Sequence, residues 1–261
     1  MSMYIKELSQ ILEVNLVNYK KKTSNFFNYL YNQSKVGFTA RQFLIYRDNY
    51  FYRTYNTIPS VAKVVVAAYK NLDSETIKSG EKNLADETGG KTPTNAHSTL
   101  LYNSHNHHAK YVFDIPPISL EDSYNSPYVL EETKLFQKIQ NSLYESNYYC
   151  KVLAVSLAQE SAAHSMIKSF YETFFIPYKA KYSESKFIQI SNYFNCHIQG
   201  LEEEHSKEAF SALVRNCKNV KDIHHSKLSI IHFLNAQAKM WNALHNELKM
   251  NQDLHEIVRI N

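Results

Sequence analysis

The run from Phe194 to His205 places two imidazoles and a carboxylate within one predicted helix. Glu202 and His205 are three residues apart and would share a face of a regular helix. His197 precedes Glu202 by five residues, which at about 100° per residue puts it roughly 140° away. A π-bulge at Gly200 would absorb one residue and bring the three side chains to one side, and such bulges often occur at functional sites. We therefore expect these residues to bind metal.

Three further candidate ligands lie upstream. Glu87 precedes a Gly-Gly pair that ends one predicted helix, and His97 lies in the next helix, which Pro93 begins. Both residues therefore sit at helix ends that flank a short loop. Glu160 lies in a run of small and apolar residues from 153 to 163, where burial of an unpaired carboxylate would be costly.

The combined donor set indicates a transition metal. Carboxylates and neutral imidazoles together suit Fe, Mn or Zn better than Ca or Mg, and a bridging carboxylate can hold two metals about 3.5–4 Å apart. Each residue alone also has an ordinary explanation, such as a solvated acidic face, a packed core histidine or a helix end. The combination favours ligands, and the predicted set is Glu87, His97, Glu160, His197, Glu202 and His205.

The elements that must position these side chains are helices. Only 5 Gly and 6 Pro occur in 261 residues, and apolar residues recur at helical spacing over long segments. Thr39 could cap a helix from 40 to about 56, Pro177 should stop a long helix that begins at 149, and the segment 114–127 is expected to be a surface loop or lid. We predict an all-α protein with one domain over residues 1–261.

Composition and charge narrow the classes of function. The formal charge is +4, and Lys and Arg are scattered instead of forming a basic block with aromatics, so no nucleic-acid partner is expected. Three irregularly placed cysteines fit neither a disulfide framework nor a CxxC metal site. The start of the chain lacks an apolar signal core, and no run approaches the roughly 18 apolar residues of a membrane span. We expect a cytoplasmic protein.

These motifs resemble those of the haem-oxygenase-like diiron oxidases, relatives of the TenA and PqqC folds that include the Chlamydia protein associating with death domains (CADD). The resemblance covers residues 80–210. It rests on Asn-Leu-Ala-Asp-Glu87-Thr-Gly-Gly with His97 ten residues on, on helical Glu160, and on His197 with Leu-Glu202-Glu-Glu-His205. It implies a helical bundle of about seven to nine helices, a homodimer, and the same six residues as ligands of two Fe, or Fe and Mn, ions. Two departures are an extra residue between His197 and the acid, and Glu where Asp is commoner.

The resemblance also implies an activity. Such proteins use O2 as a cosubstrate to oxidise an amine, an acid or an aromatic side chain. A narrower expectation is that the chain makes p-aminobenzoate, a folate precursor, by cleaving a tyrosine of its own. Tyr29 and Tyr31 are then the candidate tyrosines, and Lys168 is the candidate source of the amine.

Other classes of function stay open at this point. A TenA-like hydrolase or a PqqC-like cofactor-free oxidase would have the same fold without the six ligands, with Cys150 or Cys196 as a nucleophile in the hydrolase. A protein that only binds a host death domain would need neither metal nor nucleophile. A ferritin-like bundle would require Glu-x-x-His on two helices, and only Glu202/His205 supplies it. The cluster from His105 to His108 is expected at a wet loop or helix end.

Overall fold

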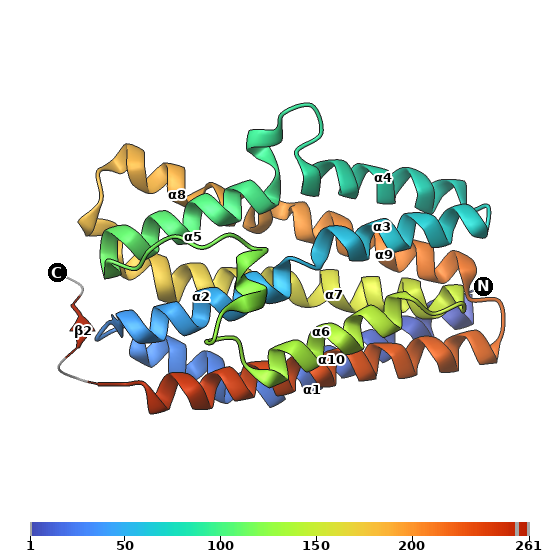
Figure 1. The fold of residues 1–261 in the computed structure, drawn as a ribbon. Helices are drawn as coiled ribbons and strands as arrows, with labels where there is room; N and C mark the ends of the chain where they lie inside the picture. Colours follow the sequence, from blue (N-terminus) through green and yellow to red (C-terminus); the bar gives the residue numbers. More distant parts are fainter. Residues whose placement is uncertain (1, 254–255, 260–261) are drawn as a thin grey trace.

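The structure is a computed structural model that describes residues 2–253 and 256–259, with the side chains of 2, 3, 201 and 202 outside the described part. Figure 1 shows an elongated bundle built almost wholly of helices. The α-helices are α1 (Ser2–Gln33), α2 (Ala40–Thr54), α3 (Thr57–Lys70), α4 (Ser74–Thr88), α5 (His97–Phe113), α6 (Glu131–Tyr144), α7 (Tyr149–Phe170), α8 (Glu184–Cys196), α9 (Glu202–Asn216) and α10 (Val220–Met250).

Short elements connect and interrupt these helices. Two π-helical turns occur, η3 (Tyr171–Phe175) after α7 and η5 (His197–Leu201) between α8 and α9. The 3-10 turns are η1 (Pro93–Asn95), η2 (Asp122–Asn125) and η4 (Ile176–Lys181). Strands β1 (Phe38–Thr39) and β2 (Ile257–Val258) form one short antiparallel pair, which composition did not predict. The predicted all-α class is confirmed.

Helix α7 runs through the middle of the bundle, and it packs against α9 and α10 and also touches α3 and α6. A helix surrounded in this way must be apolar on most of its circumference. Its sequence provides this, since Val152 to Val155 and Leu157 to Ala158 are all buried. Glu160 is buried on the same helix with 8% of its surface exposed. The packing of α7 therefore brings one carboxylate into the interior.

Local sequence signals set several helix ends where they were expected. Thr39 and Gln42 form a reciprocal capping box at the start of α2, which satisfies two orphan backbone donors. Pro177 lies in η4, just after the end of α7 and η3. The expected irregular segment 114–127 is fastened to the bundle, because Asn106 bonds both backbone groups of Ile118 and Arg47 bonds the carbonyl of Pro116.

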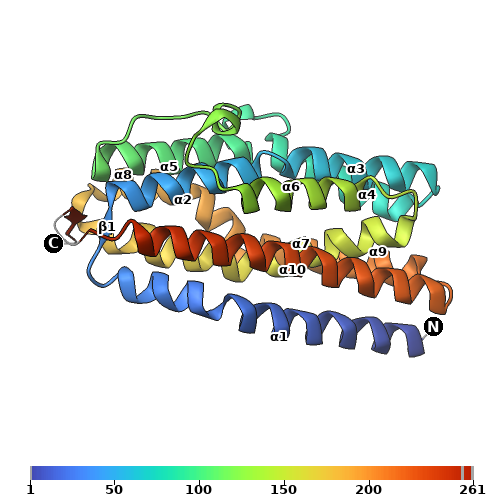
Figure 2. The same cartoon turned by 60° about the horizontal axis from the view of Figure 1, so that its bottom comes forward.

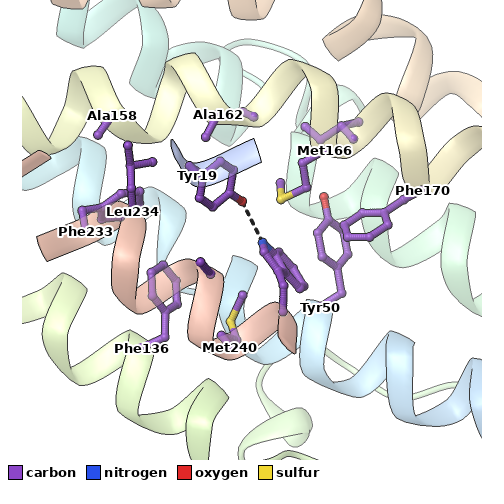
Figure 3. Packing of buried hydrophobic residues seen from close by; sticks show 14 of the residues in the cluster. Tyr19, Tyr50, Phe136, Ala158, Ala162, Met166, Phe170, Phe233, Leu234 and Met240 are labelled. Atoms are coloured by element: carbon purple, nitrogen blue, oxygen red, sulfur yellow. Dashed lines mark hydrogen bonds between the residues drawn. The ribbon is translucent and has the colours of Figure 1, made fainter. Parts of the chain in front are cut away.

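Aromatic side chains fill much of the interior between α1, α2, α7 and α10. The indole of Trp241 donates a hydrogen bond of 3.0 Å to the hydroxyl of Tyr19, so its one polar atom is satisfied. Figure 3 shows Tyr50, Met166 and Phe170 gathered beside this pair. Figure 2 shows α1 and α10 side by side along one face of the bundle. Among the described residues, no helix combines the length and the apolar character that crossing a membrane would need.

Asp73 joins three helices at one point. Its carboxylate accepts hydrogen bonds from the backbone and hydroxyl of Thr76 at the start of α4, from Tyr149 of α7 at 3.0 Å, and from Asn216 of α9 at 2.7 Å. Burial alone would raise the pKa of Asp73, but these hydrogen bonds outweigh it and lower the pKa.

Replacement Asp73→Ala is expected to lower the free energy of unfolding by about 2 kcal/mol, because it removes a helix cap and leaves buried donors unpaired. Ser183→Ala, which removes the exposed cap of α8, should cost about 0.5–1 kcal/mol. Urea unfolding at neutral pH measures both. Because the folded pKa of Asp73 is lowered, its contribution is present above the unfolded value of about 3.9 and is lost as the pH falls through the folded value. Equal losses in the two variants would contradict this role.

Candidate metal centre

A glycine turn brings Glu87 and His97 together. Glu87 lies in the last turn of α4, which ends at Gly89 with φ +80°. A Cβ at Gly89 would lie 2.6 Å from backbone atoms of Thr92 and Ala96, so the chain can turn this tightly only with glycine. His97 then opens α5, and its Nδ1 lies 3.2 Å from Oε1 of Glu87.

His197 approaches the same point from the end of α8. The rings of His97 and His197 meet edge to face with their centroids 4.5 Å apart. Cys196 joins them, because its Sγ and one nitrogen of each imidazole all lie within 4.8 Å of one another. From the sequence, Cys196 was expected to be a packing residue or, in a hydrolase, a nucleophile, and not a metal donor. Its place beside His197 was the available signal that it could also be a donor.

The chain is distorted at Gly200, but Gln199 and Gly200 leave helical φ/ψ, so a kink separates α8 from α9 where a π-bulge within one helix was predicted. A π-helical turn spans His197–Leu201, and Gly200 has φ +112°. An added Cβ would meet nothing within 4 Å there, so the backbone conformation, and not crowding, is what favours glycine. The side chain of Glu202 lies outside the described part of the structure, and its predicted role as a ligand stays a prediction.

Glu160 and His205 form a second group next to the first. His205 Nδ1 lies 4.0 Å from Oε2 of Glu160, and its Nε2 lies 3.7 Å from Oδ2 of Asp86. Asp86 precedes Glu87 on α4, so this helix directs one carboxylate toward each group. Asp86 was not predicted, and its only sequence signal is that it adjoins Glu87.

The histidines differ in charge. Burial opposes the charge of His97, but hydrogen bonding with Cys196 and Glu87 raises its pKa to about 10. Burial and the neighbouring His97 lower the pKa of His197 to about 3, and burial also lowers the pKa of His205. For Glu87, burial acts to raise the pKa, but the hydrogen bond and charge of His97 lower it. At neutral pH one charged and two neutral imidazoles therefore face a carboxylate.

Four of the predicted ligands share the wall of one cavity of about 540 Å³, namely Glu87, His97, Glu160 and His197. Tyr193 also lines it; its ring lies 4.8 Å from that of His197, and its hydroxyl is 2.8 Å from the hydroxyl of Tyr50. Glu160 and His205 together line a smaller adjoining pocket. Glu160 thus faces both the main cavity and the second group.

The donor set fits a bound transition metal. Two carboxylates, three imidazoles and one thiol converge from α4, α5, α7, the end of α8, η5 and α9. The buried Oδ2 of Asp86 and Nε2 of His205 make no hydrogen bond with any described residue, although such groups are normally paired, by a metal in some cases. Metal would be held between Glu87, His97 and His197, and between Glu160 and His205.

The residues predicted to supply a self-derived substrate lie elsewhere. Tyr31 is 60% exposed on α1 with Lys35 over its ring. Tyr29 accepts a hydrogen bond from Gln42. Lys168 is exposed on α7, 3.9 Å from Glu172. None of Tyr29, Tyr31 and Lys168 is among the described residues that line the cavity.

The expectation for the cluster 105–108 was wrong. It lies within α5, and His105 and His108 are both fully buried. His105 meets the hydroxyl of Tyr46 at 3.1 Å and His108 meets that of Tyr182 at 2.8 Å. Burial holds the pKa of both histidines low, so they are neutral core residues. Polar side chains in the sequence suggested water, but in the structure aromatic residues from distant segments surround both rings and one nitrogen of each meets a tyrosine hydroxyl.

Comparison with known proteins gives the fold. No protein-family model and no curated protein matches the sequence. A CADD-like protein of unknown function from Nostoc punctiforme PCC 73102 is similar in structure, with TM-score 0.73, 14% identity, and coverage of 95% of this chain and 99% of that chain. A second crystal structure of that protein gives TM-score 0.70 with 13% identity, covering 96% of this chain and 98% of that one.

A domain of unknown function from Shewanella denitrificans OS217 is also similar. It has a haem oxygenase-like fold, and the comparison gives TM-score 0.67 and 15% identity over 94% of this chain and 95% of that chain. Likeness at such low identity concerns the path of the chain and not its chemistry. The protein therefore has a haem oxygenase-like fold of the form found in a CADD-like protein.

Proposed function

We propose that this protein is a non-haem dinuclear iron, or mixed iron and manganese, oxidase or oxygenase that uses O2 on a substrate held in the cavity. The observation that carries the proposal is that Glu87, His97, His197 and Glu160 line one cavity, and that Glu160 also lines an adjoining pocket with His205. Cavities of this kind, with few convergent polar groups, are the usual place of ligand binding.

The type of donor supports iron or manganese. Carboxylate oxygen and imidazole nitrogen suit these metals, and Glu160 faces both groups, as a carboxylate between two metals must. When bound, the metals would supply the electrons for O2 and the oxidising power used on the substrate.

The residues of the chain would bind and orient the substrate, and they would exclude water from the site. Ile58, Leu120, Met166 and Ile167 make part of the cavity wall apolar, which limits the water near the reacting groups. Burial raises the pKa of Tyr193 well above its usual value, so its hydroxyl keeps its proton at neutral pH. It can therefore share a hydrogen bond with Tyr50 and hold the ring against His197.

A substrate that enters the cavity is favoured over Tyr29 or Tyr31 of the chain itself, with Lys168 as amine donor. None of these three side chains is among the described residues that line the cavity, and Tyr31 is exposed to solvent. Production of p-aminobenzoate from this chain would require them to move to the site, or would use a tyrosine of the wall such as Tyr50 or Tyr193.

A second candidate follows from Cys196. A thiolate with two imidazoles, here His97 and His197, is a donor set that suits a single zinc ion with one open position. Such a centre would support hydrolysis and not O2 chemistry. The two candidates differ in the number of metals and in whether the thiol binds one.

The first prediction concerns the number of iron ions that each chain binds. Metal-free protein loaded anaerobically with Fe(II) should bind two irons per chain and change its optical spectrum on exposure to O2. Iron analysis and stopped-flow absorption measure this. Cys196→Ser should leave the stoichiometry unchanged. Binding of one iron or fewer per chain would reject the dinuclear proposal, and one metal per chain that is lost in Cys196→Ser would support the single-metal candidate.

A second prediction concerns the ligands one by one. His97→Ala, His197→Ala and Glu160→Gln should each weaken Fe(II) binding by about tenfold or more, since even residues outside the inner sphere contribute this much. His232→Ala, which changes an exposed histidine of α10, is the control and should have no effect. Competition with a chromophoric chelator gives the affinities. If Glu160→Gln binds as the control does, Glu160 is not a ligand.

The third prediction concerns protons. His97 is protonated at neutral pH because its pKa is raised to about 10, whereas a ligand imidazole must be neutral, so binding should release about one proton from this residue. Affinity should therefore rise with pH from 6 to 8. Calorimetry in buffers with different ionisation enthalpies counts the protons. His97→Ala should release about one proton fewer, and an unchanged count would show that His97 keeps its proton.

A further inference from the structure

Among the described residues, one cation in the cavity wall makes no ion pair and no hydrogen bond through its Nε. Arg53 lies in the last turn of α2 with 8% of its surface exposed, and it lines the cavity. Its Nε makes no hydrogen bond, and no described carboxylate lies within 4.0 Å of its guanidinium. Buried charges are normally paired and hydrogen-bonded, because desolvation is otherwise costly.

Arg47 on the same helix shows what a structural arginine looks like here. It is 2% exposed, its Nε donates to Asp48 at 2.9 Å, and its Nη1 donates to Asn106 and to the carbonyl of Pro116. The end of α2 favours a positive charge at Arg53 through the helix dipole. The dipole nevertheless leaves Nε of Arg53 without an acceptor among the described residues.

A second donor without a partner adjoins Arg53. The hydroxyl oxygen of Thr54 is buried, makes no hydrogen bond, and belongs to a residue of the same cavity wall. Arg53 is the one Lys or Arg among the described lining residues. The carboxylates of that wall, Glu87 and Glu160, face the histidines, as described above. The donors of Arg53 and Thr54 are thus left for an anion that enters the cavity.

The rest of the wall limits what else the anion can carry. Ile58, Pro59, Leu120, Ala163, Met166 and Ile167 contribute aliphatic surface, and a cavity of about 540 Å³ exceeds the size of a simple inorganic anion. A planar guanidinium matches a carboxylate in geometry through two parallel hydrogen bonds.

We infer that the cavity binds an amphipathic monocarboxylic acid, with its carboxylate on Arg53 and Thr54 and its apolar or aromatic body extending toward Glu87, Glu160 and His197. This deepens the proposed function by naming the class of substrate. The carboxylate contact itself uses no metal, so it can be tested apart from that function.

The test uses the full-length, metal-free protein with 3-phenylpropanoate and octanoate as probes, and with the matching alcohols and amines. Calorimetry should show that each acid binds about tenfold or more tightly than its alcohol, since a charge-assisted pair is stronger than a neutral one. The amines should bind most weakly. In Arg53→Gln the preference for the acid over the alcohol should disappear.

Two further variants keep the result interpretable. Arg41→Gln changes an exposed arginine on the same helix and should bind like the wild type. Arg53→Lys keeps the charge but not the planar fork, so it should bind the acids severalfold more weakly while remaining folded by circular dichroism, even if Arg53→Gln does not fold. Equal binding of acid and alcohol by the wild type, no binding of either, or unchanged acid binding in Arg53→Lys would overturn the inference. Failure to bind iron would reject the metal centre and leave this result standing.

Discussion

Burial of ionisable side chains inside a helical bundle is the constraint on which the rest of this structure depends. A carboxylate such as Glu160 on α7 or Glu87 at the end of α4 can be buried at low cost only where positive or hydrogen-bonding groups contact it. His97 meets Glu87 in this way at 3.2 Å, and His205 lies 4.0 Å from Glu160. The two pairs come from four different segments, so the packing of α4, α5, α7 and α9 must be correct before either carboxylate is stabilised.

Two local departures from regular helix lie beside the candidate site. The turn at Gly89 reverses the chain between Glu87 and His97 in a space that no side chain could share. The segment His197–Leu201, where Gln199 and Gly200 leave helical φ/ψ, joins α8 to α9. Such departures are common where function competes with regular structure.

The same bundle contains histidines that have a purely structural setting, and the contrast is informative. His105 and His108 are surrounded by aromatic rings and bond tyrosine hydroxyls. His97, His197 and His205 instead lie beside carboxylates, a thiol or one another. Burial is similar in both groups, so burial alone does not distinguish a core histidine from a candidate ligand. The partners do.

The sequence by itself determined the helical class, the cap at Thr39, the turn at Gly89 and a distortion at Gly200. These features depend on neighbours a few residues away, through backbone geometry and local hydrogen bonds. It also predicted Glu87, His97, Glu160, His197, Glu202 and His205 as ligands, and that role stays a prediction. Only the tertiary structure decided that Asp86 and Cys196 lie beside the histidines, that Tyr29, Tyr31 and Lys168 lie outside the described cavity wall, and that Nε of Arg53 makes no hydrogen bond with a described residue. Those outcomes depend on contacts between residues far apart in the chain, which no local pattern encodes.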